Sequence, residues 1–226
     1  MRHGKTERAS LEHLIFYPQS TDTKYATVVA LHGRGTDEYD LLPLVETLGL
    51  KKTLVISPRA PLQFDAGGLV GGFAWYEFGD EGKPLPQTFQ LSVDRLRRFL
   101  EEIKAAYPVD PERLFLLGFS QGTVMAYATA LQDPGSFRAI VALSGYVPLQ
   151  SGLALKLEHL DGLAVFISHG IYDEIIPVRY GRESAELLKS AGANVVFREY
   201  PMGHEVRSET LRDLGMWLNG TLPEVE

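Results

Sequence analysis

The feature that most constrains the fold is a series of short apolar runs separated by longer stretches with helical spacing. Such runs are typical of strands buried on both faces of a parallel sheet. They fall at residues 27–31, 53–57, 114–119, 139–143 and 164–168, and the last strand is expected at 195–200. Helical spacing is clearest at 91–107, where Leu96, Phe99 and Leu100 share one face before Pro108 ends the pattern. This alternation predicts an α/β fold with a mostly parallel central sheet, helices on both faces and no large cap domain.

The remaining stretches complete this outline. We expect further helices at 40–48, 123–132, 177–191 and from 208 onward, and an early edge strand at 11–17. Residues 58–88 are rich in glycine and aromatic residues and are expected to be irregular and to wall a pocket. A second irregular segment at 146–161 is expected to hold a short helix near 153–159. No internal repeat or linker divides residues 1–226, so we expect one domain.

Composition excludes several classes of function. The formal net charge is -7, which argues against a nucleic-acid or anionic-membrane partner. The chain has no cysteine, which excludes disulfides, thiolate catalysis and cysteine-ligated zinc. No apolar run has the length of a signal peptide or a membrane span, so we expect no integral membrane association and a cytoplasmic location. The oligomeric state is left open.

The pentapeptide Gly118-Phe119-Ser120-Gln121-Gly122 stands between a predicted strand and a predicted helix. Glycines on both sides of a serine allow a sharp strand-to-helix turn that lifts the serine hydroxyl clear of the sheet edge. This context favours Ser120 as a nucleophile over the alternative that it is a small turn residue.

Two further polar residues at predicted strand ends supply what a serine nucleophile needs. A base must accept its proton, and a carboxylate must orient that base. Ser120, Asp173 and His204 occur in the order expected of an α/β-hydrolase. Asp173 has an alternative role as a helix cap, and the adjacent Glu174 competes for the role of the acid; the shorter side chain nearer the strand end favours Asp173.

Other residues are expected to support the loops of the site or to donate hydrogen bonds from their backbone amides. His32 and His169 precede glycines at strand ends and are expected to brace loops, because neither follows the acid in the chain. An oxyanion needs preorganised donors, and we expect them to be the backbone amides of Gln121 and Arg34. The alternative for residues 32–35 is an ordinary tight turn.

No metal-ligand spacing and no phosphate-binding loop is found, so we expect no metal and no cofactor. The expected partner is a small-molecule acyl ester.

These motifs together resemble the phospholipase/carboxylesterase family of serine hydrolases, which includes the acyl-protein thioesterases. The similarity runs along nearly the whole chain, through Leu31-His32-Gly33-Arg34-Gly35, Ala74-Trp75-Tyr76, the pentapeptide around Ser120, His169-Gly170-Ile171-Tyr172-Asp173 and Tyr200-Pro201-Met202-Gly203-His204. The resemblance implies the same triad and oxyanion amides, and it matches Trp75 and Tyr76 to an aromatic pair beside the acyl site. Arg34 and Thr123 depart from the leucine and glycine that many relatives carry. A cation at the mouth would alter which acyl or alcohol groups are accepted.

We therefore expect a serine carboxylesterase that hydrolyses short to medium acyl esters through an acyl-enzyme. The alternatives are an acyl-protein thioesterase or lysophospholipase with the same mechanism, and, in another class, a non-catalytic binding module on a hydrolase fold. Within segment 58–88, the expected substrate-binding residues are Leu69, Phe73, Trp75 and Tyr76. The alternative is that these aromatic residues belong to the core beneath a loop.

Overall fold

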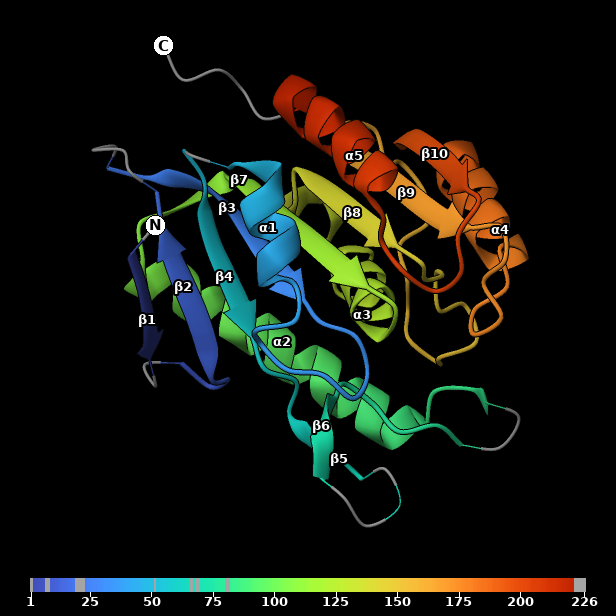
Figure 1. Ribbon diagram of the computed structural model, residues 1–226, viewed down its shortest axis with the longest axis horizontal. Helices are drawn as coiled ribbons and strands as arrows, with labels where there is room; N and C mark the ends of the chain where they lie inside the picture. Colours follow the sequence, from blue (N-terminus) through green and yellow to red (C-terminus); the bar gives the residue numbers. More distant parts are fainter. Residues whose placement is uncertain are drawn as a thin grey trace.

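A large, mostly parallel sheet forms the centre of the molecule (Figure 1). The computed structural model describes residues 2–6, 9–18, 23–50, 52–65, 67, 70–79 and 82–221. In spatial order the eight strands are β1 (Arg2–Thr6), β2 (His13–Tyr17), β4 (Leu54–Pro58), β3 (Tyr25–Leu31), β7 (Val109–Phe119), β8 (Ala139–Leu143), β9 (Ala164–Gly170) and β10 (Asn194–Tyr200). Strand β2 is antiparallel to β1 and β4, whereas all pairings from β4 across to β10 are parallel.

Helices cover both faces of this sheet. The α-helices are α1 (Leu42–Leu48), α2 (Pro86–Ala106), α3 (Gln121–Ala130), α4 (Arg179–Ser190) and α5 (Ser208–Thr221), with a 3-10 turn η2 at Pro134–Ser136. Buried residues of α2, α3 and α4 form one core cluster with the sheet, and those of α1 and α5 form a second cluster on the other face. The arrangement is an α/β-hydrolase fold without a large cap domain.

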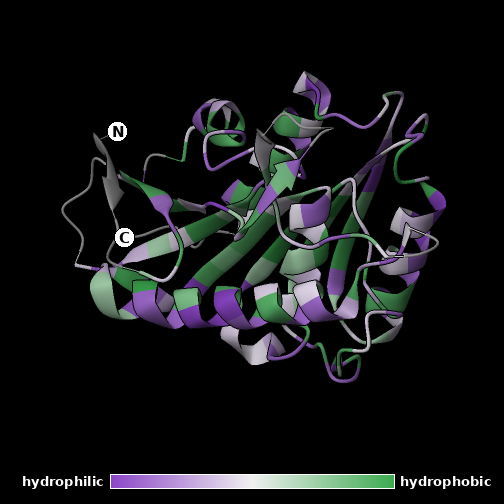
Figure 2. Cartoon of the chain, turned by 90° about the horizontal axis from the view of Figure 1, so that it is seen from below, coloured by the Kyte–Doolittle hydropathy of each residue, from purple (hydrophilic) through white to green (hydrophobic). Residues whose placement is uncertain are grey.

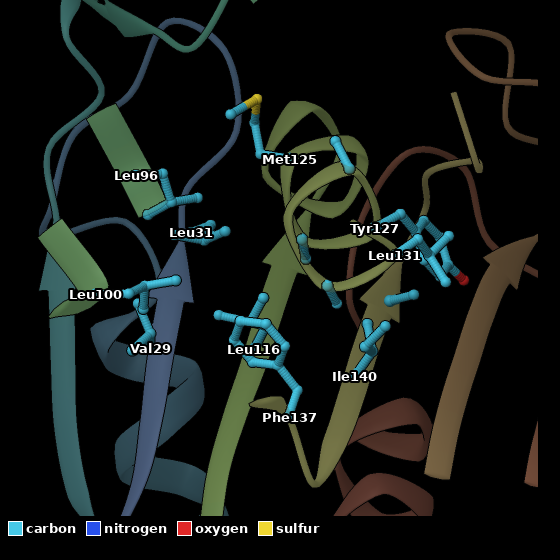
Figure 3. Close-up of a cluster of buried hydrophobic side chains, with 14 of the residues drawn as sticks. Val29, Leu31, Leu96, Leu100, Leu116, Met125, Tyr127, Leu131, Phe137 and Ile140 are labelled. Atoms are coloured by element: carbon cyan, nitrogen blue, oxygen red, sulfur yellow. The ribbon is translucent and has the colours of Figure 1, made fainter. Parts of the chain in front are cut away.

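The alternation of side chains along β3 explains the two clusters. Val29 and Leu31 belong to the cluster under α2 and α3, and Val28 and Ala30 belong to the cluster under α1 and α5. A strand buried on both faces must be apolar throughout, which is why the central strands are such continuous apolar runs. Figure 2 shows these hydrophobic strands at the centre, with hydrophobic and hydrophilic residues alternating along the outer helix α2. Figure 3 shows the side chains that meet between α2, α3 and the sheet.

The amino-terminal edge differs from the expectation. The strand expected at 11–17 is β2, but it is not the edge, because β1 pairs along its outer side. The sequence Arg-His-Gly-Lys-Thr of β1 has no apolar alternation. Strand pairing at an edge needs only backbone hydrogen bonds, so this strand left no signal in the pattern of side chains.

Two expectations for irregular segments are also wrong in part. Segment 58–88 contains a two-stranded hairpin of β5 (Leu62–Asp65) and β6 (Val70–Ala74), and helix α2 begins at Pro86 rather than at residue 91. Proline suits a first helical turn, and the fully buried Phe89 starts the apolar face earlier. No helix occurs at 153–159, all of which the structure describes. Leu153, Leu155 and Leu157 are half-buried at alternate positions, which is the period of an extended segment.

Among the described residues, no helix combines the length and the apolar character that crossing a bilayer requires.

Replacing Leu116 by alanine tests the core of the sheet. Leu116 is fully buried on β7, between Val29 of β3 and Ile140 of β8 (Figure 3). Deletion of a buried leucine side chain leaves a cavity, so we expect the free energy of unfolding to fall by roughly 2–5 kcal/mol, measured by urea unfolding. Met216 on α5, which is 62% exposed, provides the control: Met216→Ala is expected to change it by less than about 0.5 kcal/mol. Equal effects of the two substitutions would contradict this description of the core.

Candidate active site

The turn between β7 and α3 holds Ser120 in a strained conformation. Its φ is 53° and its ψ is -119°, a region that residues other than glycine rarely adopt. The turn needs small residues on both sides. A Cβ on Gly118 would collide with the backbone of Gly122, and a Cβ on Gly122 would collide with the carbonyl group of Leu31. The two glycines therefore let β7, α3 and β3 approach one another while the Ser120 side chain remains partly exposed.

His204 lies within hydrogen-bond distance of both Ser120 and Asp173. Its Nε2 atom is 2.9 Å from Ser120 Oγ, and its Nδ1 atom is 2.8 Å from Asp173 Oδ2. A carboxylate can only accept, so Nδ1 carries the proton and Nε2 is free to accept one from the serine. The Phe119 ring packs beside the imidazole with centroids 4.9 Å apart. Glu174 is exposed and, among the described residues, makes no hydrogen bond to His204.

Neighbouring loops hold the Asp173 carboxylate in place. Its Oδ1 atom accepts hydrogen bonds from the backbone amides of Ile175 (3.0 Å) and Ile176 (2.8 Å). His169 Nε2 donates to the Ile176 carbonyl oxygen at 2.7 Å and lies 3.5 Å from Asp173 Oδ2. His169 thus braces the loop that carries the acid, as the sequence predicts. The side chain of Asp173 is fully buried.

The loop after β3 brings Arg34 close to Ser120. A Cβ on Gly33 would lie 3.7 Å from Ser120 Cβ, so the residue before Arg34 is in contact with the strand-to-helix turn. Within the part of the chain that the structure describes, neither the Arg34 nor the Gln121 amide has a hydrogen-bond acceptor. These are the two amides that the sequence predicts as oxyanion donors, and they remain available to a ligand.

His32 braces this loop from beneath. Its Nδ1 donates to the Gly33 carbonyl oxygen at 2.7 Å, and its Nε2 accepts from the Ala60 amide at 3.0 Å. One nitrogen must donate and the other must accept, so the imidazole is neutral. Burial lowers the pKa of His32, which favours the same state.

The side chain of Gln121 joins the turn to the segment that carries the aromatic pair. Its Oε1 accepts from the Trp75 amide at 2.8 Å, and its Nε2 donates to the Tyr76 carbonyl oxygen at 2.7 Å. From the sequence, only the backbone amide of Gln121 is expected to act at the site, and this side-chain contact is not predicted. No pattern in one sequence reveals it, because the partners are backbone groups 45 and 46 residues away.

The predicted substrate-binding residues have different surroundings. Trp75 is fully buried, and its indole N–H donates to the His32 carbonyl oxygen at 3.0 Å. Tyr76 is 1% exposed, and its ring packs edge to face against that of Phe89, with centroids 5.0 Å apart. This burial favours the alternative that the pair belongs to the core. Phe73 is half-buried beneath the Arg59 guanidinium, and Leu69 lies outside the described residues. A role for any of the four in binding substrate remains a prediction.

Thr123 fastens the first turn of α3 to β8. Its Oγ1 accepts from the Leu143 amide at 3.1 Å and lies within donating distance of the carbonyl oxygens of Gly118 (2.7 Å) and Leu143 (2.8 Å). The side chain occupies the space beside Gly145, where a Cβ would collide with it. This departure from the usual glycine therefore stabilises the turn. Across the described residues, no group of three or more His, Asp or Glu side chains is placed to hold a metal ion.

Comparison with known proteins agrees with this fold. The model of the family described as Phospholipase/Carboxylesterase matches residues 16–222. The chain therefore belongs to the phospholipase/carboxylesterase family, as its motifs predict, and is a serine ester hydrolase.

Individual relatives are similar over most of their length. The chain is 28% identical to acyl-protein thioesterase 1 of Cryptococcus neoformans, over 92% of this chain and 97% of the relative. It is 30% identical to acyl-protein thioesterase 1 of Debaryomyces hansenii, over 74% of this chain and 75% of the relative. Among solved structures, a Bacillus cereus carboxylesterase superposes with a TM-score of 0.81 at 25% identity, covering 94% of this chain and 95% of that one. A Mesorhizobium loti carboxylesterase has the same fold, with a TM-score of 0.84 at 20% identity over 97% of this chain and 100% of that one.

Substitutions at Gln121 test whether its side chain supports the site. Gln121→Glu keeps an acceptor for the Trp75 amide but places a carboxylate against the Tyr76 carbonyl oxygen, and Gln121→Ala removes both hydrogen bonds. Each leaves a buried polar group unsatisfied, so we expect both to lower the free energy of unfolding by about 1–3 kcal/mol. We expect kcat for a p-nitrophenyl ester to fall by on the order of tenfold, because the 121 amide is no longer held in place. Wild-type values in both variants would show that the contact is incidental.

Acidification provides a test of the buried neutral histidines. Burial lowers the pKa values of His13, His32 and His169 below their ordinary 6.5. Below about pH 6.5 these histidines become protonated in the unfolded chain but stay neutral in the folded chain. The free energy of unfolding is therefore highest above about pH 6.5 and decreases as the pH falls toward the pKa values of the folded state. Each histidine contributes up to about 1.4 kcal/mol per pH unit in that window.

Denaturant unfolding between about pH 8 and pH 5 measures this dependence. We expect His32→Gln to be less stable than the wild type at neutral pH but to lose less stability on acidification. A slope identical to that of the wild type would mean that His32 does not titrate differently in the folded and unfolded states.

Proposed function

We propose that this chain hydrolyses carboxylic esters of short to medium acyl chain length, with Ser120 as nucleophile, His204 as general base and Asp173 as the acid that orients it. The observation that carries this proposal is the continuous hydrogen-bonded path from Asp173 Oδ2 through His204 to Ser120 Oγ, at 2.8 Å and 2.9 Å. All three residues follow the carboxyl ends of parallel strands, where ligands gather in open α/β sheets.

Acylation would begin as Ser120 Oγ attacks the ester carbonyl carbon. His204 Nε2 takes the hydroxyl proton, and the buried carboxylate of Asp173 stabilises the resulting imidazolium. The amides of Arg34 and Gln121 donate to the negatively charged oxygen of the tetrahedral intermediate. Collapse breaks the carbon–oxygen bond to the leaving group, which takes the proton from Nε2 and departs as an alcohol.

Deacylation repeats these steps with water. His204 Nε2 removes a proton from a water molecule as its oxygen attacks the acyl-enzyme carbonyl carbon. The second tetrahedral intermediate uses the same two amides, and its collapse returns the proton to Ser120 Oγ and releases the carboxylic acid. Every group needed is supplied by the chain itself, so the proposed mechanism uses no cofactor.

A thioesterase activity is the second candidate, because the two sequence relatives described above are named acyl-protein thioesterase 1. The solved structures described above are carboxylesterases. Both reactions use the same triad, so the leaving atom distinguishes them. Comparing kcat/KM for an oxygen ester and a thioester of equal acyl length would decide between them, and including lysophospholipids would test the lysophospholipase alternative.

The decisive variant is Ser120→Ala, measured on p-nitrophenyl esters of increasing acyl length. We expect kcat to fall by about 10⁴-fold or more at every length, since the nucleophile is removed. Ser144→Ala is the matched control. Ser144 also follows a parallel strand with a positive φ of 49°, but its buried hydroxyl has no partner among the described residues. We expect that control to retain activity. Turnover that survives in Ser120→Ala would exclude the proposed nucleophile, and no turnover by the wild type on any ester, thioester or lysolipid would favour the binding module.

A further inference from the structure

The side chain of Arg34 lies over two aromatic rings contributed by another part of the chain. Its Cζ atom is 4.4 Å from the ring centroid of Phe64, on β5, and 4.9 Å from that of Phe78, in the segment before α2. Stacking engages the planar faces of a guanidinium group and leaves its N–H groups free to donate at the edge. The cation is therefore held in a defined orientation rather than moving freely in solvent.

Among the described residues, this guanidinium has no carboxylate partner. No Asp or Glu oxygen of the described residues lies within 4.0 Å of it, although the loop that carries Arg34 is rich in acidic residues. Those residues are engaged elsewhere. Glu38 forms a bidentate ion pair with Arg59, Asp37 Oδ1 accepts from the Tyr39 amide, and Asp40 Oδ2 accepts from the Thr36 hydroxyl. Arg34 is exposed, and no hydrogen bond among the described residues engages its guanidinium N–H donors.

Arg34 lies close to the residues of the proposed active site. Gly33, the preceding residue, touches the strand-to-helix turn at Ser120, and the Arg34 amide is a proposed oxyanion donor. The Phe78 ring beneath the guanidinium packs against the Tyr76 ring, with centroids 5.4 Å apart. The Tyr76 carbonyl oxygen accepts from the Gln121 side chain at 2.7 Å, so this aromatic segment is bonded to the residue that follows Ser120. The cation therefore lies over aromatic residues that are linked to the site.

We propose that Arg34 is a specificity-determining residue that binds an anionic group, a carboxylate or a phosphate, carried by the ester substrate. An arginine edge matches such a group with two parallel N–H donors. The overall charge of -7 repels anionic substrates. One oriented cation beside the site would instead attract an anionic group to that position. This inference rests on the proposed esterase function and adds the substrate class to it.

Paired substrates that differ only in charge test the proposal. For the acyl side we would compare the p-nitrophenyl half-ester of glutaric acid with the p-nitrophenyl ester of monomethyl glutarate. For the alcohol side we would compare 4-acetoxybenzoate with 4-acetoxybenzamide. The quantity measured is the ratio of kcat/KM for the anionic substrate to kcat/KM for its neutral counterpart. The pair that responds identifies which side of the ester carries the anion.

In Arg34→Met we expect this ratio to fall by about tenfold or more for one pair, mainly through KM, because a charge-assisted hydrogen bond is lost. Arg34→Lys is expected to give an intermediate ratio, since it keeps the charge without the paired donors. Arg95→Met, which removes an exposed arginine of α2, should leave the ratio unchanged. Added salt should lower the wild-type ratio.

The outcomes separate this inference from the proposed function. A purely structural role for Arg34 would lower kcat/KM for both members of a pair equally and leave the ratio unaltered, which would overturn the inference. A wild-type ratio insensitive to salt and to both Arg34 substitutions would do the same. Failure of the esterase proposal would instead appear as the absence of Ser120-dependent turnover of the neutral esters.

Discussion

The close approach of β7, α3 and β3 at the strand-to-helix turn is the constraint on which the rest of the site depends. Any Cβ at Gly118 or Gly122 would collide with backbone atoms, so these three elements meet at a separation that only glycine permits. The strained φ of Ser120 follows from this contact, because the chain must reverse within one residue. Thr123 fixes the other side of the turn to β8. Strain at one residue is thus balanced by hydrogen bonds and packing around it.

The β5–β6 hairpin belongs to this same framework. Backbone hydrogen bonds join Gly35 and Thr36 to Phe73 in both directions, each 2.8 Å long, and a Cβ on Gly72 would collide with the Gly35 carbonyl group. The segment after the hairpin is held by the Gln121 side chain. Both predicted oxyanion amides are therefore supported by residues 73–76. Gln121 is bonded to Trp75 and Tyr76 through its own side chain, and Arg34 is held through its neighbour Gly35, which is bonded to Phe73. Preorganised donors need this kind of support, since an amide that must reorient stabilises the transition state less.

Much of this could be predicted from the sequence, because burial on two faces dictates apolar runs and a serine between glycines dictates a turn. The strands β3, β4, β7, β8 and β9 and the convergence of Ser120, Asp173 and His204 follow from those two patterns. Strand β10 was also predicted, although it lies at the edge of the sheet and is only partly buried. Strand β1 was not, because it is held by backbone pairing that imposes no side-chain period. The hairpin was missed because its contacts are with a loop rather than with a sheet. The links made by His32 and Gln121 end on backbone carbonyls and amides, which carry no residue identity for a pattern to detect.

The state of the buried histidines bears on the charge of Asp173, the acid of the proposed triad. His169 lies 3.5 Å from that carboxylate, and a protonated imidazole there would compete with His204 for the negative charge. Burial lowers the pKa of His169, and its bond to the Ile176 carbonyl oxygen needs only one proton, so it remains neutral. The carboxylate is then held by two amides, which orient it without neutralising it. In the proposed mechanism, the negative charge of this carboxylate acts on His204 when the imidazole becomes a cation, which is where a positioned carboxylate has its effect.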